Sequence, residues 1–246
     1  MKKASTIIDE YNQEAIQYDR RWQRYIDETV QTTLAVARPE MYRFIQKNPR
    51  GTLLDIGCGT GAFTFQMKTE LPWEWNIIGV DPSHKMLDRA KQKYRENQRQ
   101  QQKHDSPALE GERQSNKEGI CFVEGKCEHL PWDDNSLEII TTLSSFHFWT
   151  DKETGLSEIN RVLRPNGILI LSDWCHDFLA CRMCALYLWL FGYPPESWQL
   201  LTLNQACAMI TEQNFVIETM ASYPINLRIF LFGPKWGMMT IVARKR

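Results

Sequence analysis

The sequence predicts an α/β fold in which a mostly parallel sheet carries helices on both faces. Between residues 52 and 172, short apolar runs alternate with amphipathic stretches of helical period, as in strand–helix–strand units with right-handed crossovers. Two further strand-like stretches, 215–223 and 236–243, follow near the C-terminal end and can form an antiparallel pair. We therefore expect seven strands in one sheet, within a single domain over residues 1–246.

The individual elements are predicted from local patterns. Apolar runs bounded by turn residues predict strands at 52–56, 77–81, 120–124, 137–143 and 168–172, with a turn at 164–167 before the last. Apolar residues at three- and four-residue spacing predict a helix starting near Ser83 and others at 62–70, 151–163, 175–191 and 202–213. The core would span 49–174, and 175–246 would supply lid helices and the last two strands. The stretch 225–232 is apolar and fits more than one assignment.

Residues 1–48 are expected to form an N-terminal helical cap. The spacing of apolar residues predicts a first helix and then a second one over about 27–46, which Pro39 would kink or divide. Tyr11, Tyr18 and Trp22 share one face, which favours a ligand-lining role as much as simple packing.

Composition excludes several classes of function. The chain has 246 residues, 43% of them apolar, and a net charge of −1, so nothing favours broad nucleic-acid binding. The N-terminal residues lack an apolar signal core, and the most apolar stretch, 178–191, contains Arg182 and is too short to span a bilayer. Seven cysteines form no even framework, so we expect free thiols in a reducing cytoplasm. Cys181 and Cys184 fall within an apolar helix, which favours buried thiols over a metal site.

Residues 96–118 differ from the rest of the chain. Gln, Lys, Glu, Ser and Asn dominate this stretch, and Ala108 and Leu109 are its two clearly apolar residues. Such a segment cannot bury enough apolar surface to offset its ordering entropy. We expect a disordered insertion on the surface.

The centre of the predicted site is the turn that follows the first strand of the core. Asp55 is followed by glycines at positions 57, 59 and 61, which allow positive φ and a close approach of the backbone to a ligand. Asp81 ends the next strand, where a carboxylate can accept two ribose hydroxyls. Gly125 and Ser144 follow two further strands, so the four strand ends should meet at one edge of the sheet.

A dinucleotide-dependent dehydrogenase is the competing interpretation of this turn. Residues 57–62 satisfy the G-x-G-x-x-G/A pattern with an acid further along the chain. Asp55 argues against it, because its carboxylate would repel a pyrophosphate. The same carboxylate would suit a ligand that carries an amine or a sulfonium.

The chain resembles the class I S-adenosylmethionine-dependent methyltransferases, of the broad Methyltransferase-11 type that includes the ubiquinone/menaquinone C-methyltransferases. Residues 54–61 (LDIGCGTG) match the first motif of that family, and 79–90, from Gly79-Val80-Asp81, resemble the second. Residues 128–132 (EHLPW) resemble its E-x-L-P-F, and 146–167 resemble the stretch after its fourth strand. The match covers about residues 50–175 and implies a Rossmann-like fold with S-adenosylmethionine as cofactor, converted to S-adenosylhomocysteine.

The resemblance also implies roles for residues. The cofactor would be bound by residues of the glycine turn, of the ends of the following strands and of the helical cap: Asp55, Gly57, Cys58, Gly59, Gly61, Asp81, Pro82, Met86, Lys126, Cys127, Glu128, Ser144 and Tyr18. Lys126 stands where the family commonly has an acid for the adenine amino group, and Lys cannot accept a hydrogen bond. Adenine recognition would then rely on backbone groups or on Glu128.

Methyl transfer is an in-line displacement that needs positioning in a dry pocket more than charge chemistry. Aromatic faces can hold the sulfonium, and the aromatic residues expected around the acceptor are Tyr11, Trp22, Phe146, Trp149 and Trp174. If the nucleophile must lose a proton, His147 is the first candidate for the base and Asp173 a weaker one.

The expected acceptor is a small molecule. The segments 178–191 and 225–232 fit the cover of an apolar or aromatic acceptor, and they fit ordinary core packing or a dimer contact equally well. Neither a nucleic acid nor a resident metal is expected, and the chain would be a monomer or a homodimer. The alternative is a non-catalytic scaffold protein that keeps the cofactor-binding fold.

Overall fold

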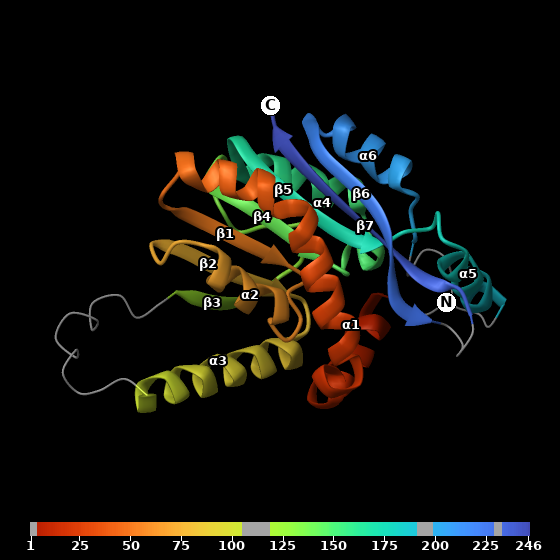
Figure 1. Ribbon diagram of the computed structural model, residues 1–246, viewed down its shortest axis with the longest axis horizontal. Coiled ribbons are helices and arrows are strands. Elements are labelled where there is room, and N and C mark those ends of the chain that lie inside the picture. The colour runs from red at the N-terminus through yellow and green to blue at the C-terminus, as the bar shows by residue number, and fades with distance from the viewer. Residues whose placement is uncertain (1–3, 105–118, 191–198, 229–232) are drawn as a thin grey trace.

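The computed structural model describes residues 4–104, 119–190, 199–228 and 233–246, and the strands within these ranges form one seven-stranded sheet (Figure 1). The strands are β1 (Gly51–Ile56), β2 (Trp75–Asp81), β3 (Ile120–Glu124), β4 (Leu137–Leu143), β5 (Leu163–Trp174), β6 (Phe215–Arg228) and β7 (Lys235–Lys245). Their order is β3-β2-β1-β4-β5-β7-β6. The first five pair in parallel, and β7 pairs antiparallel with β5 and β6. The predicted fold class is confirmed.

The register of the parallel strands places their carboxyl ends at one edge. Ile56, the last residue of β1, is aligned with both Val80 of β2 and Thr142 of β4. The chain runs outward from β1 through β2 to β3 and then returns to β4 on the other side of β1. Ligands in open α/β sheets bind at such a reversal of strand order. Figure 1 shows the arrowhead of β1 directed toward the lower half of the first helix.

Helices cover both faces of the sheet. They are α1 (Ala4–Lys47), α2 (Ala62–Glu70), α3 (His84–His104), α4 (Lys152–Val162), α5 (Leu179–Leu190) and α6 (Leu203–Glu212), with a 3₁₀ turn η2 (Phe146–Phe148) after β4. Successive residues of a strand point to opposite faces. Accordingly Leu53 packs in a cluster with residues of α1, α2 and α3, whereas Leu54 packs with residues of α4 and α6. The sheet is therefore the middle of three layers.

The N-terminal cap is one continuous helix of 44 residues, so the prediction of two helices was wrong. Pro39 lies inside α1 without dividing it. Proline lacks an N–H and so costs a helix a hydrogen bond, but Leu34, Ala37 and Met41 on either side of it are fully buried. Packing of this face against the sheet thus keeps the helix continuous through the proline.

The first part of the predicted insertion is helical. α3 continues to His104, so residues 96–104 are helical, and the remainder, 105–118, lies outside the described residues. The side chains of 96–104 are mostly long and unbranched, and such residues extend an anchored helix at little cost. Residues 96–100 are mostly exposed, so the polar composition there reflected a solvent-exposed part of a helix rather than a loop.

Three boundaries near the C-terminal end also differ from the prediction. β5 begins at Leu163, because the predicted turn is accommodated as an irregularity within the strand, with Asn166 at φ 64°. α5 begins at Leu179 rather than 175, because Cys175 forms a bridge with Leu201. β6 reaches Arg228 and takes in the start of the ambiguous stretch, while 229–232 lies outside the described residues.

Within the described ranges, no helix is long and apolar enough to cross a membrane. The same part of the chain contains no group of three or more His, Cys, Asp or Glu side chains that could hold a metal ion. Cys181 is fully buried, and its thiol lies 3.4 Å from the Gly237 carbonyl oxygen.

Candidate active site

A cavity of about 360 Å³ lies at the carboxyl ends of β1, β2, β3 and β4, beneath the first half of α1. This volume falls within the range of small-molecule sites, roughly 300–1,000 Å³. The residues from the strand ends and the loops that follow them are Asp55–Thr60, Asp81–Ser83, Gly125–Glu128 and Leu143–Ser145. The cavity is therefore built where the reversal of strand order predicts a ligand site.

The glycine turn takes the backbone conformation that its sequence predicts. Gly57, Gly59 and Gly61 have φ values of 69°, 54° and 82°, a region that glycine adopts without strain. The Gly57 and Cys58 amides donate to the Val80 carbonyl oxygen at 2.7 and 3.0 Å, which fixes the turn against β2. A Cβ atom at Gly57 would lie 2.4 Å from the Ser145 side chain, whereas one at Gly59 would meet no atom within 4 Å. Gly59 thus leaves open space for a ligand to approach the backbone.

Asp81 closes the turn from the neighbouring strand. Its two carboxylate oxygens accept hydrogen bonds from the Gly59 and Ser83 amides, each at 2.8 Å. The side chain is buried, and this burial raises its pKa to about 6 despite the two amide donors, which lower it. Each oxygen of a carboxylate can accept a second hydrogen bond. Asp81 lines the cavity and can therefore accept hydroxyl donors from a ligand there.

Asp55 lies deeper, below the turn. Its carboxylate accepts hydrogen bonds from the Thr64 hydroxyl of α2 at 2.6 Å and the Thr141 hydroxyl of β4 at 2.8 Å. Burial raises its pKa to about 6, against the opposite effect of the two hydroxyls. Asp55 thus joins three elements beneath the turn, and it also forms part of the cavity wall.

The loop after β3 forms one end of the cavity. Lys126, Cys127 and Glu128 line it together with Thr150, whose amide donates to the Glu128 carboxylate at 3.2 Å. Arg161 of α4 fixes this loop by hydrogen bonds. Its guanidinium donates to the carbonyl oxygens of Leu130 and Trp132, both at 2.8 Å.

Three tyrosines of α1 cover the cavity from the other side. Tyr11, Tyr18 and Tyr25 recur every seven residues, which places them on one face of the helix. Burial raises the pKa of Tyr18 to about 12 and that of the other two well above its usual value, so all three phenols are neutral. The rings of Tyr11 and Phe148 make an edge-to-face contact with centroids 5.6 Å apart.

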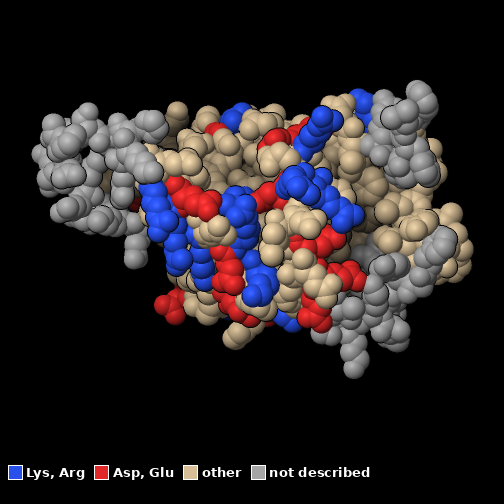
Figure 2. All heavy atoms as spheres, turned by 90° about the horizontal axis from the view of Figure 1, so that it is seen from below, with Lys and Arg blue, Asp and Glu red and all other residues tan. Residues whose placement is uncertain are grey.

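Polar contacts hold this half of α1 in place. The Ser83 hydroxyl donates to the Asn12 side-chain oxygen at 2.8 Å. Asp19 accepts hydrogen bonds from the Thr60 hydroxyl at 2.5 Å and from the Lys93 ammonium at 3.1 Å. Figure 2 shows basic and acidic side chains interspersed on the face seen from below, without an extended basic surface. The contacts between α1 and α3 are thus part of a surface of mixed charge.

Comparison with known proteins agrees with this geometry. Residues 54–171 match the model of a family described as a methyltransferase domain. A ubiquinone/menaquinone biosynthesis C-methyltransferase of Campylobacter jejuni is 29% identical over 235 residues, which cover 89% of this chain and 88% of that protein. Residues 54–171 are thus a methyltransferase domain, of the kind found in the S-adenosylmethionine-dependent methyltransferases.

Other similarities are more partial. An uncharacterized methyltransferase of Schizosaccharomyces pombe is 30% identical over 60% of this chain, and the match spans only half of that relative's length. The crystal structure of a Thermotoga maritima protein, described as a possible histamine N-methyltransferase, superposes with a TM-score of 0.66. It is 17% identical and covers 96% of this chain and 98% of its own, so it supports the fold of the methyltransferase.

The methyltransferase cavity brings together most of the residues singled out from the sequence. Those that line it are Tyr11, Tyr18, Asp55, Gly57, Cys58, Gly59, Asp81, Pro82, Met86, Lys126, Cys127, Glu128, Ser144 and Trp149. Those that do not line it are Gly61, Trp22, Phe146, His147 and Trp174. Of this second group, Phe146 and His147 are buried behind the wall, whereas Trp22 is only half-buried.

Each residue of the second group has another environment. Gly61 is the N-cap of α2 and faces the Phe65 and Phe122 rings. Phe146 is 1% exposed within the main core, and Trp22 packs against the Tyr25 ring. His147 and Trp174 stack on each other with ring centroids 4.2 Å apart.

Some lining residues of the methyltransferase were not expected from the sequence. Tyr25 is one of them, although its spacing of seven residues from Tyr18 is a signal that would have identified it. Its hydroxyl lies 2.6 Å from the Ser144 hydroxyl and accepts a hydrogen bond from the Trp174 indole N–H at 2.6 Å. Phe148 and Ser145 were also missed, because no local pattern separates them from Phe146 and His147.

Proposed function

We propose that this methyltransferase binds S-adenosylmethionine in the cavity beneath α1 and transfers its methyl group to a small acceptor. The observation that carries the proposal is the arrangement of Gly59 and Asp81 in one cavity wall. Gly59 leaves backbone open to a ligand, and the carboxylate bound to its amide retains acceptor capacity. These features fit a ligand that carries both a ribose and an extended chain.

The residues present account for the parts of the cofactor. Asp81 would accept the ribose hydroxyls, and Met86 would pack on the adenine beside Cys127 and Glu128. The Glu128 carboxylate offers an acceptor that Lys126 cannot provide. The turn at Gly57–Gly59 would lie against the methionine part, above Asp55.

The neutral tyrosines suit the positive charge of the cofactor. A sulfonium is attracted to the faces of aromatic rings, and this attraction is stronger in a desolvated site. When bound, S-adenosylmethionine supplies an electrophilic methyl group. The chain's own contribution is then to hold the ligands in line and to exclude water, which the cover of α1 over the cavity favours.

The acceptor that fits this wall is small and mainly apolar. Beside the three tyrosines, the wall carries the side chains of Ile7, Ile8, Ile26, Phe63, Leu143 and Phe148. An acceptor with several charges would lose its hydration here without matched partners. We therefore favour an acceptor with an apolar or aromatic body.

Calorimetry with S-adenosylmethionine tests the first half of the proposal. We expect a saturable signal from the purified chain and a structure with S-adenosylhomocysteine in which Asp81 contacts both ribose hydroxyls. Absence of binding would refute the proposal. Binding without transfer to any small acceptor would favour the alternative of a non-catalytic protein that keeps the fold.

A further inference from the structure

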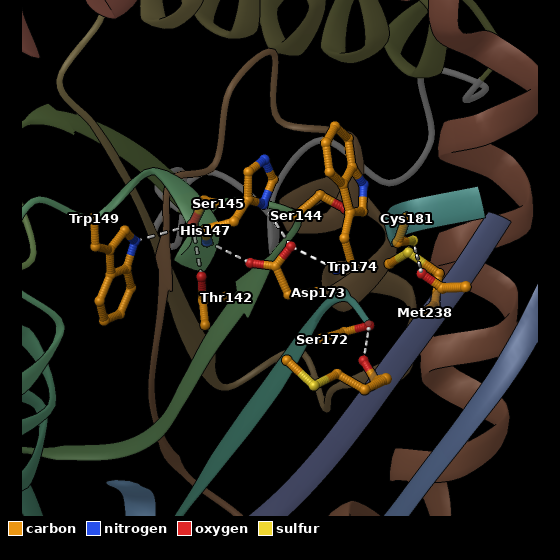
Figure 3. Close-up of polar contacts among 12 residues, drawn as sticks. Thr142, Ser144, Ser145, His147, Trp149, Ser172, Asp173, Trp174, Cys181 and Met238 are labelled. Carbon is orange, nitrogen blue, oxygen red and sulfur yellow. Dashed lines mark hydrogen bonds and ion pairs between the residues drawn. The ribbon is translucent and has the colours of Figure 1, made fainter. Parts of the chain in front are cut away.

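A buried histidine and a buried aspartate lie next to each other just behind the cavity wall. His147, in η2 after β4, is 2% exposed, and Asp173, near the end of β5, is 1% exposed. The Nδ1 atom of His147 lies 2.6 Å from Asp173 Oδ1 (Figure 3). These residues are 26 positions apart in the sequence, and the pairing of β4 with β5 brings them together.

Asp173 accepts hydrogen bonds from three donors. The His147 amide donates to Oδ2 at 2.7 Å, and the Trp174 amide donates to Oδ1 at 2.6 Å. A carboxylate only accepts hydrogen bonds, so the third contact requires that His147 Nδ1 carry its proton. Asp173 therefore holds the imidazole in the tautomer whose lone pair is on Nε2.

Nε2 is a buried acceptor without a hydrogen-bond partner among the described residues. Figure 3 shows the ring with Nδ1 toward Asp173 and its other nitrogen pointing away from it. The ring stacks on Trp174 at an interplanar angle of 16°, and the Phe148 centroid is 3.9 Å away. A buried polar atom of this kind calls for a partner, and at a functional site the partner is often a ligand. Phe148 also lines the cavity, so the imidazole is one side chain away from it.

We infer that His147 is the general base of the reaction, that Asp173 is its positioning residue, and that the acceptor is a phenol. This inference rests on the proposed function. The hydroxyl proton of the phenol passes to Nε2 of His147, while its oxygen forms the new bond to the methyl carbon. The carbon–sulfur bond breaks with its electron pair remaining on sulfur, and the imidazolium is balanced by the Asp173 carboxylate. A nucleophile and base within reach of each other, with the base oriented by a third group, is a recurring catalytic arrangement.

The aromatic surroundings of Nε2 favour a phenol over an aliphatic alcohol. The Trp174 ring stacks on the imidazole, and the Phe148 ring lies against it at an interplanar angle of 46°. An aromatic acceptor that takes the place of the Phe148 ring would keep the imidazole covered by apolar ring surface and bring its hydroxyl to Nε2. Asp173 also interacts electrostatically with two titratable groups on other elements, Tyr25 of α1 and Lys152 of α4. Both must be considered when a pH profile is interpreted.

The test compares His147→Gln and Asp173→Asn with the wild type, and uses His176→Gln as the matched control. His176 lies in the same region but is not part of the cavity wall or of the pair. The probes are phenol and 4-nitrophenol with S-adenosylmethionine, between pH 5.5 and 9. At pH 9, the upper end of this range, 4-nitrophenol is largely ionised, so its transfer does not need a base and the two phenols are compared at this pH.

We expect His147→Gln to lower the transfer rate to phenol by roughly 10²–10⁴-fold, the usual contribution of a general base, and to remove the rise of rate with pH. The rate with 4-nitrophenol should change much less. Asp173→Asn should weaken the transfer to phenol in the same selective way, and His176→Gln should leave both rates unchanged. Calorimetry should give the same affinity for S-adenosylmethionine in all four proteins.

A second readout does not depend on turnover. Nitrogen-15 NMR of the imidazole should show His147 protonated at Nδ1 in the wild type, with a changed tautomer ratio in Asp173→Asn. A wild-type Nε2-protonated form, an equal loss of both phenols in His147→Gln, or transfer to amines but to no phenol would each overturn the inference. Loss of S-adenosylmethionine binding by the wild type would instead refute the proposed function. If His147→Gln fails to fold in a thermal unfolding assay, Asp173→Asn decides by the same criteria.

Discussion

The Gly59 amide donates a hydrogen bond to the Asp81 carboxylate at 2.8 Å, and this contact joins the glycine turn after β1 to the end of β2. The two motifs are 22 residues apart and are read separately in the sequence. In the structure they form one wall, because β1 and β2 pair in parallel and end together. The turn and the acid therefore form one continuous part of the cavity wall.

Asp81→Ala should weaken the binding of S-adenosylmethionine by roughly 1–3 kcal/mol, the cost of stranding or removing buried hydrogen bonds. Calorimetry measures this change directly. The matched control is Asp88→Ala, since Asp88 is an exposed acid on the adjoining helix α3. An unchanged affinity in Asp81→Ala would contradict the placement of the ribose.

The buried carboxylate of Asp55 should make folding stability depend on pH in a defined window. Its pKa is about 6 in the folded chain because of burial, against about 3.9 for an exposed Asp. The folded state therefore binds more protons between these values, so the free energy of unfolding should fall as pH rises from about 4 to about 6. Asp81 contributes in the same direction.

Asp55→Asn removes one of these titrations. Urea unfolding between pH 4 and 7 should then show a weaker dependence on pH than the wild type, by up to about 3 kcal/mol over the window for a shift of about two units. If the slope of the wild type is retained in Asp55→Asn, the raised pKa of Asp55 is not the cause.

Two glycine substitutions should separate strain from ligand contact. Gly57→Ala places a Cβ atom 2.4 Å from the Ser145 side chain, so it should destabilise the fold, and Ser145→Gly should restore part of the loss. Gly59→Ala meets no atom within 4 Å, so its cost to stability is mainly that of a positive φ, about 1–2 kcal/mol. Thermal unfolding and calorimetry together should show weaker cofactor binding in Gly59→Ala despite a modest loss of stability. Equal binding in Gly59→Ala and the wild type would argue against close approach of the ligand to the turn.

Arg161 should act on cofactor binding from a distance. It pairs with Glu158 at 2.7 Å and donates hydrogen bonds to the carbonyl oxygens of Leu130 and Trp132. These hydrogen bonds hold the loop that contains Glu128. Arg161→Ala should lower the free energy of unfolding by about 1–3 kcal/mol, because it removes hydrogen bonds to carbonyl oxygens. The partial exposure of the Arg161 side chain favours the lower part of this range. The substitution should also weaken S-adenosylmethionine binding. Arg161→Lys should behave similarly, because Lys lacks the planar fork that reaches both carbonyls. Arg95→Ala, on the exposed side of α3, is the control expected to change neither quantity.

The order of strands and helices was predictable because each depends on local sequence. Leu53 and Leu54 alternate between the two faces of β1, and this period of two is visible without knowledge of the fold. The turn at Gly57 was equally local, since alternate glycines permit the positive φ values that this turn requires. The boundaries were less predictable: Pro39 predicts a break by itself, and only burial of its neighbours on the sheet keeps α1 intact.

The sequence by itself determined the class of fold, the position of the ligand turn and the acid of the second strand. Those features follow from side-chain period and backbone permissiveness over a few residues. Only the tertiary structure decided which side chains face the cavity and which stand behind it. It placed Tyr25 in the wall and Phe146 in the core, and it joined His147 to Asp173 through the pairing of β4 with β5. Such contacts depend on how distant elements pack, and no local pattern records that packing. The Gly59–Asp81 contact belongs to both categories, because the sequence supplies its two partners and the sheet brings them together.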